Sequence, residues 1–242
     1  LIDLFSSFIR YYLWMAIYGS SGQEVLGGLS RSEMVVYVFM VYVTSSVVMV
    51  SISTQVSNDV VQGTVAMNLI KPIDYRLSLM SQAFGVLMYR FLVPCIFIWI
   101  GLEIYKVTVL GLALAGVGEI CLFLLSCIMS FLIYVLFDFC FGMIAFFTTY
   151  IFGLRMVKEA LLGFLTGQLI PISFFPETVR RVFDFLPFSS MIYTPVMIYL
   201  GKYTGSTLMF MLLRQAVWVV FIYLLGSLIW KKVTKRLVVL GG

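Results

Sequence analysis

Residues 34–52, which run MVVYVFMVYVTSSVVMVSI, carry no charged side chain and are mostly apolar. A helix that crosses the hydrocarbon core of a bilayer needs about 20 mostly apolar residues, which is close to the length of this run. Ser30 and Glu33 precede it at the S-x-x-E spacing of a capping box, in which the two residues satisfy each other's backbone N–H groups. The stretch therefore predicts a transmembrane helix with a defined start.

The composition of the whole chain agrees with this stretch. Of its 242 residues 62% are hydrophobic and 11% are charged, whereas a soluble domain carries roughly 25% charged residues. A fold in water has too little polar surface to cover so much apolar material, so lipid must be the solvent for much of it. We expect residues 1–242 to form a single transmembrane domain. Because the chain begins at Leu1 and enters an apolar segment almost at once, we expect its N-terminus to be truncated.

The apolar stretches together predict an all-α membrane protein with about six transmembrane helices. Besides 34–52, the predicted spans are residues 4–18, 74–101, 116–150, 160–174 and 208–230. Charged residues indicate a break at 103–106 and a turn at 153–159. Trp230 ends the last span, where an aromatic residue of the membrane interface belongs.

A polar interval, residues 54–76, separates the second and third predicted spans. Within it Thr64 is a candidate N-cap for a two-turn helix over 65–70, and Pro72 would stop that helix because proline cannot continue its hydrogen bonding. Asp74 is a candidate N-cap for the third span. We therefore expect a short helix inside this loop.

A different kind of segment, residues 176–206, precedes the last span. Within 176–186 an apolar and a charged face recur at helical spacing. The apolar face carries Val179, Val182, Phe183 and Leu186, and the charged face carries Glu177, Arg180, Arg181 and Asp184. This pattern predicts an amphipathic helix that lies in the membrane surface. Pro187 and Pro195 are expected to separate this helix from the last span.

The orientation follows from the basic residues, which gather in cytoplasmic loops. The densest cluster comes directly after the last span and consists of Lys231, Lys232, Lys235 and Arg236. It predicts a multi-pass protein of the cell membrane, with a bacterial cytoplasmic membrane as the expected setting and both termini in the cytoplasm. The loop 54–76 is then cytoplasmic and the segment 176–206 external. The basic residues that oppose this assignment are Arg31, Lys106, Arg180, Arg181 and Lys202.

Several classes of function are excluded. The chain has no histidine, so most metal and acid–base sites lose their usual ligand. It has no GxxxxGK[ST] phosphate loop, so we expect no ATP binding by that motif and no enzyme activity of its own. The four cysteines, at positions 95, 121, 127 and 140, lack CxxC spacing and indicate neither disulfides nor a metal site. The net charge of +5 is scattered, which gives no nucleic-acid footprint.

Charged residues inside the predicted spans are functional candidates, because a charge at membrane depth is costly unless it is paired or hydrated. Asp138 is the most interesting of them, followed by Glu119 and Arg90. They pair with each other, sit in the membrane interface or stabilise a helix contact; alternatively, Asp138 carries ions. The second alternative would make the chain an ion-gradient-driven secondary transporter or a channel. A membrane scaffold without vectorial flux is a third possibility.

Four groups of motifs resemble the ABC-2 family of exporter permeases. They are GLSRSEMVVY at 28–37; DVVQGTV at 59–65 with LIKPI at 69–73; LIPISFFP at 169–176 with LPF at 186–188 and YTP at 193–195; and KRL at 235–237 with GG at 241–242. Each is modestly specific, whereas their order and spacing over nearly the whole chain are much more so. Lys71 departs from the arginine that many relatives have before the proline.

The resemblance implies a division of labour. Two permease subunits, identical or paralogous, would form the path through the lipid bilayer, and separate ABC ATPase subunits would bind ATP and Mg²⁺ in the cytoplasm. The short helix in 54–76 would be the coupling helix that enters a groove of the ATPase. The coupling residues implied are Asp59, Gln62, Gly63, Thr64, Val65, Leu69, Ile70, Lys71, Pro72 and Arg76. This chain would then hold no cofactor itself.

The same resemblance implies that the second and fifth spans face the partner permease and line the substrate path. Polar or adaptable side chains in those apolar stretches are the candidates: Tyr42, Ser45, Met49 and Gln168. Interhelical hydrogen bonding is the alternative role for them. The sequence leaves the transported substrate open.

Overall fold

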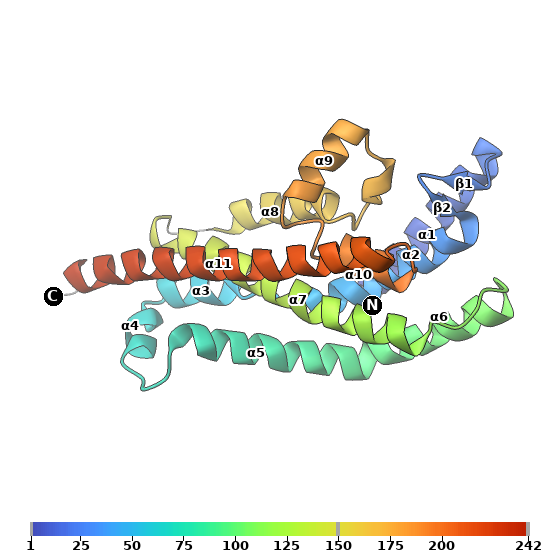
Figure 1. Ribbon diagram of the computed structural model, residues 1–242. Helices are drawn as coiled ribbons and strands as arrows, with labels where there is room; N and C mark the ends of the chain where they lie inside the picture. Colours follow the sequence, from blue (N-terminus) through green and yellow to red (C-terminus); the bar gives the residue numbers. More distant parts are fainter. Residues whose placement is uncertain (1, 149–150, 241–242) are drawn as a thin grey trace.

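The computed structural model describes residues 2–148 and 151–240. It is almost entirely helical (Figure 1). Its α-helices are α1 (Ile2–Ser21), α2 (Arg31–Val48), α3 (Ser53–Val61), α4 (Thr64–Leu69), α5 (Tyr75–Arg90), α6 (Ile96–Thr108), α7 (Val117–Gly142), α8 (Phe152–Leu165), α9 (Glu177–Phe185), α10 (Tyr193–Tyr199) and α11 (Gly205–Leu240). The strands β1 (Val25–Leu26) and β2 (Leu29–Ser30) form a small antiparallel hairpin before α2.

Among the described residues, four helical stretches are long and apolar enough to cross a membrane. They are Arg31–Val61, Tyr75–Thr108, Val117–Phe146 and Gly205–Thr234. The expected all-α membrane protein is confirmed. The expected number of spans is not, because α1 and the 14-residue α8 do not qualify by length and composition.

The long helices run along one axis of the molecule, with α7 in contact with α2, α3, α10 and α11 (Figure 1). The loop that carries α4 and the end of α11 lie at one end, and the β1–β2 hairpin and the end of α6 lie at the other. The chain therefore has two distinct ends, which we call the α4 end and the hairpin end.

The capping box predicted before the second span is confirmed. Ser30 is the N-cap of α2, its hydroxyl accepts from the Glu33 N–H at 3.3 Å, and the Glu33 carboxylate accepts from the Ser30 N–H at 2.8 Å. The helix ends at Val48, earlier than 34–52 implied, and residues 49–52 connect it to α3 without helical structure.

The third span is longer than predicted. Asp74 caps α5 as expected, since its carboxylate accepts from the Arg76 N–H at 2.8 Å. Pro94 lies in a π-helical turn, Phe91–Cys95, and the helix continues through it as α6. The predicted break at 103–106 is wrong, because Lys106 and Glu103 form an ion pair of 3.1 Å one helical turn apart and stay in the helix.

The region after the fourth span differs most from the prediction. The described part of that helix ends at Phe146, after a 3-10 turn, and the predicted end at position 150 lies outside the described residues. The predicted turn at 153–159 is wrong, since these residues form the first half of α8. The predicted span 160–174 is wrong as well, because α8 ends at Leu165 and the chain turns at Gly167, whose φ of +79° is costly for other residues.

The segment before the last span holds two helices. Amphipathic α9 begins after Pro176 as predicted. The break expected at Pro195 is wrong, because Pro195 lies in the first turn of α10, where its missing N–H has no helical partner to lose. All residues of α10 are buried. Trp230 is buried too, since it stacks on Tyr75 with ring centroids 5.5 Å apart, so it is not an interfacial aromatic as predicted.

Most of the basic residues that opposed the predicted orientation form ion pairs with acidic residues. Lys202 pairs with Glu33 at 2.7 Å, Lys106 with Glu103, and Arg181 with Glu177. Lys71, directly after α4, and Lys231 and Lys232, in the last third of α11, are exposed. The positive-inside rule counts basic residues and gives acidic ones little weight, so these ion pairs do not change the orientation prediction.

Candidate functional site

The loop between α3 and α5 is organised around one carboxylate. Asp59, at the end of α3, accepts hydrogen bonds from the Thr64 hydroxyl at 3.0 Å, the Asn68 amide at 3.4 Å and the Tyr75 hydroxyl at 2.7 Å. These donors belong to both ends of α4 and to the start of α5. Asp59 therefore ties both ends of α4 to α3 and to the start of α5.

Helix α4 confirms the short helix predicted at 65–70, although its start differs. Gly63 is the N-cap with φ of +72°, and Thr64 is the first helical residue. The expected Thr64 cap is wrong, because the Thr64 hydroxyl donates to Asp59 and does not accept from the helix backbone. The turn between α3 and α4 thus depends on the glycine backbone.

Replacing Gly63 tests this turn. A Cβ at this position would meet nothing within 4 Å, so Gly63→Ala costs stability through its left-handed backbone alone, about 1–2 kcal/mol. Gly63→Asn is the matched control, because asparagine adopts this conformation more readily. Thermal unfolding of the purified chain in detergent should give the lowest midpoint for alanine and an intermediate one for asparagine. Equal midpoints for alanine and glycine would show that the turn does not constrain the loop.

Apolar side chains project from this loop. Exposed fractions reach 84% for Ile70, 66% for Met67 and 60% for Ile73, whereas Val65 on the opposite side of α4 is buried. Val61, at the end of α3, is also half exposed. Together they form an apolar tip at the α4 end. An exposed apolar patch of this kind is typical of a surface that binds another protein or a membrane.

The remaining predicted coupling residues divide between two roles. Gln62, Lys71 and Pro72 are exposed beside the apolar tip, and Lys71 donates to Asn68 at 2.7 Å. Arg76 instead anchors the loop to the last helix, since it donates to the Ser227 hydroxyl at 3.0 Å. Its guanidinium also donates to Asp74 and lowers the pKa of that carboxyl. The Leu69 side chain lies outside the described part of the chain.

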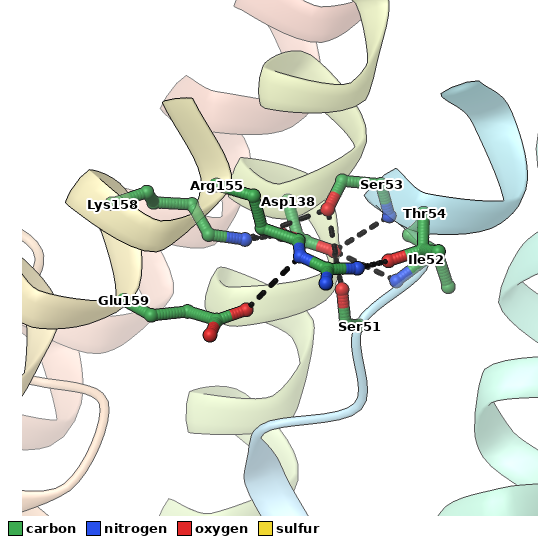
Figure 2. A network of polar contacts seen from close by, with 8 residues as sticks. All are labelled: Ser51, Ile52, Ser53, Thr54, Asp138, Arg155, Lys158 and Glu159. Carbon is green, nitrogen blue, oxygen red and sulfur yellow. Dashed lines mark hydrogen bonds and ion pairs between the residues drawn. The ribbon is translucent and has the colours of Figure 1, made fainter. Parts of the chain in front are cut away.

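A second polar site lies inside the protein, where α3 begins (Figure 2). Asp138 of α7 is fully buried and forms an ion pair with Lys158 of α8, which is 5% exposed. The other carboxylate oxygen accepts from the backbone N–H groups of Ile52 and Ser53, each at 2.7 Å, and from the Ser51 hydroxyl at 3.1 Å. We call these residues the Asp138 cluster.

The sequence marks Asp138 as a candidate but not its partners. It places Lys158 in a turn, and residues 51–53 at the end of a span or the start of a loop. A signal was present: a buried carboxylate needs a cation, and Lys158 with Arg155 has the spacing of one helix face. Asp138 is therefore paired, but with Lys158 and not with Glu119 or Arg90 as expected. Glu119 accepts from the Gly116 N–H at 3.0 Å, and Arg90 donates to the Ser46 and Met49 carbonyls, so both serve helix ends.

The predicted path residues are not brought together within one subunit. Tyr42 is buried on α2, the Ser45 hydroxyl donates to the Tyr42 carbonyl at 3.1 Å, and Met49 lies where α2 ends. Gln168 comes after α8 and accepts from Arg10 at 2.8 Å through its carbonyl. The adjacent Gly167 carbonyl accepts from Tyr37, which places Gln168 beside the earlier part of α2.

These features define an all-α membrane protein with a short, apolar-tipped helical loop at one end. The sequence model described as ABC-2 family transporter protein matches residues 4–241. The chain belongs to the ABC-2 transporter family, and its class is that of the permeases of ABC transporters. The match covers nearly the whole chain, so the resemblance seen in the separate motifs is confirmed. No curated protein and no solved structure matches the chain.

Proposed function

We propose that the chain is the permease subunit of an ATP-driven exporter. It forms the translocation path with a second permease and is driven by separate ABC ATPase subunits, which bind ATP and Mg²⁺. The observation that carries this proposal is the loop at the α4 end, where a two-turn helix presents exposed Met67 and Ile70 and is held in place by Asp59. A short helix with a fixed base can transmit a rigid-body movement from a partner.

We further propose that the α4 end is cytoplasmic. The exposed Lys71, Lys231 and Lys232 support this orientation under the positive-inside rule. The C-terminus then lies in the cytoplasm, and we propose the same for the N-terminus, since α1 runs toward the external hairpin end (Figure 1). The segment 176–206 becomes external.

The experiment is co-purification and reconstitution. The tagged chain is co-expressed with a candidate ABC ATPase, and the complex is placed in phospholipid vesicles with fluorescent amphipathic dyes as probes. We expect stable association and dye movement that requires ATP. Ion-gradient-driven flux by the chain alone would instead favour a secondary transporter. The pairing of Asp138 with Lys158 gives that alternative no support.

Cross-linking tests the proposed contact between two permeases. Cysteines at Met49 and Gln168, which are partly exposed, should cross-link between subunits in the assembled complex, whereas cysteine at buried Tyr42 should react poorly. Cysteine at Phe185 of α9, which is 77% exposed, is the control for random collision. Consistent failure at Met49 and Gln168 would reject these helices as the facing surfaces.

Helix α9 is proposed to lie flat at the external interface. Its Arg181 pairs with Glu177 on an exposed side, while Phe183 packs on Phe175 with centroids 5.1 Å apart. A spin label at Arg180 should be accessible to water-soluble relaxation agents, and one at Val182 should be accessible to oxygen dissolved in lipid. Equal accessibility of both labels to both reagents would mean that α9 is not an interfacial helix.

A further inference from the structure

Helix α3, which connects the membrane part to the coupling loop, is bound to two other helices at its first turn. We infer that the Asp138 cluster, together with Arg155 and Thr54, forms a rigid connection of α3 to α7 and α8, which we call the joint. Through it, movement of the coupling loop displaces α8. The inference rests on the proposed function, because it needs an ATPase that moves the loop. The route runs from α4 through α3 to α8 by way of Asp138, Arg155 and Lys158.

The first half of the joint is the attachment of α3 to α7. The N-cap residue of α3 is Ile52, which has no side chain able to cap. The Asp138 carboxylate takes that role from another helix, since it accepts from the N–H groups of Ile52 and Ser53. One turn later, a Cβ on Gly142 would lie 3.0 Å from the Ser53 Cα. Helix α3 is thus fixed to α7 by a charge and by close backbone contact.

The second half is the attachment of α3 to α8. Lys158 pairs with Asp138 from the side away from the α3 amides, and its ammonium lies 4.9 Å from the centre of the Phe141 ring. Arg155, one turn earlier in α8, donates to the Thr54 hydroxyl at 2.6 Å (Figure 2). Two side chains from one face of α8 therefore hold the first turn of α3.

The far end of α8 is anchored as well. The Tyr37 hydroxyl donates to the Gly167 carbonyl at 2.7 Å, and Arg10 donates to the Gln168 carbonyl at 2.8 Å. An α-helix of 14 residues is a stiff rod about 21 Å long. A displacement applied to α3 at one end of α8 is therefore delivered to α2 and α1 at the other.

The joint should stay closed while its surroundings bend. Opening it would leave the Asp138 carboxylate and the Lys158 ammonium unpaired in the interior, which is strongly unfavourable. Residues 49 and 50, between α2 and the part of the chain that Asp138 holds, lack helical structure and are the place where bending costs less. The Arg90 guanidinium, which holds the Met49 carbonyl at 3.3 Å, borders this bend on its other side.

Distances between spin labels in the complex with its ATPase test the joint. After replacement of the native cysteines, one label pair joins exposed Asn58 of α3 to Val157 of α8, and another joins Val157 to Ile104 of α6 at the hairpin end. Upon trapping with ATP and vanadate, the first distance should stay unchanged within the width of its distribution. The second distance should shift.

The decisive variant is the neutral pair Asp138→Asn/Lys158→Gln, which leaves no isolated buried charge and keeps similar side-chain volumes. It should still bind the ATPase, but its Asn58–Val157 distribution should broaden and the Val157–Ile104 shift should be lost. Lys158→Arg retains the charge and should retain the shift. Arg181→Gln removes an exposed ion pair of α9 and is the control. Both distances, and the shift upon trapping, should be the same as in the wild type.

Two results would overturn the inference. One is a wild-type Asn58–Val157 distance that changes upon trapping, because the joint would then open. The other is a neutral pair that keeps both wild-type distances and the shift, because the cluster would then serve packing alone. If the wild-type chain does not bind the ATPase at all, the proposed function fails and the inference fails with it. Loss of the shift in the neutral pair with the ATPase still bound concerns the joint only.

Discussion

The double change Met67→Asp/Ile70→Asp should detach the ATPase while the chain still inserts into the membrane. Both side chains are mostly exposed in the isolated chain, at 66% and 84%, so neither is needed for its own fold. In the proposed groove each aspartate would bury an unpaired carboxylate and remove apolar contact. The combined loss should weaken binding by at least about 100-fold, which corresponds to two steps of about 1.4 kcal/mol.

The measurement is co-purification of the ATPase together with ATP hydrolysis by the complex. Phe185→Asp is the matched control, since Phe185 is 77% exposed but lies on α9, away from the loop. It should leave ATPase binding unchanged. If the double variant retains both binding and hydrolysis, α4 is not the element that meets the ATPase, and the proposed coupling has no structural basis in this loop.

Local signals made parts of the fold predictable. The start of α2 follows from Ser30 and Glu33, which are only three residues apart, and the start of α5 follows from Asp74 in the same way. Amphipathic α9 follows from the spacing of its own residues. In each case the groups that satisfy one another are neighbours in sequence, so no tertiary information was needed.

The failures have the opposite cause. Arg155 and Lys158 indicated a turn because a charged cluster in an apolar chain usually marks a loop, yet their partners Thr54 and Asp138 come from α3 and α7. Pro195 also indicated a break, but the N-terminus of α10 accommodates it. Burial of Trp230 depends on Tyr75, far away in the sequence.

The candidate site shows the same division. The short helix in the loop at the α4 end was predictable because its motif is contiguous, and the structure adds that Asp59 and Arg76 hold the loop while Gln62 and Ile70 project from it. The Asp138 cluster was predictable only in its one conspicuous residue. Its backbone donors, Ile52 and Ser53, carry no side-chain signal, so sequence patterns alone could not reveal that a carboxylate of α7 caps α3.

Removing Asp138 should destabilise the chain more than removing Lys158. In Asp138→Ala the Lys158 ammonium, whose side chain is 3% exposed, stays buried without an acid, and two N–H groups of α3 lose their acceptor. Breaking a buried pair in this way costs about 3–5 kcal/mol. In Lys158→Met the carboxylate stays buried but keeps both N–H donors and the Ser51 hydroxyl, so part of its charge remains compensated.

The order of thermal unfolding midpoints in detergent checks this asymmetry. Asp138→Ala should be the least stable, with a midpoint lowered by roughly 10 °C, and Lys158→Met should lie between it and the wild type. Asp138→Asn/Lys158→Met should lose least, since it contains no isolated charge and the asparagine oxygen still accepts from the α3 backbone. If Lys158→Met were as unstable as Asp138→Ala, the ion pair alone would account for the cluster. The backbone hydrogen bonds that fix α3 to α7 would then contribute nothing measurable.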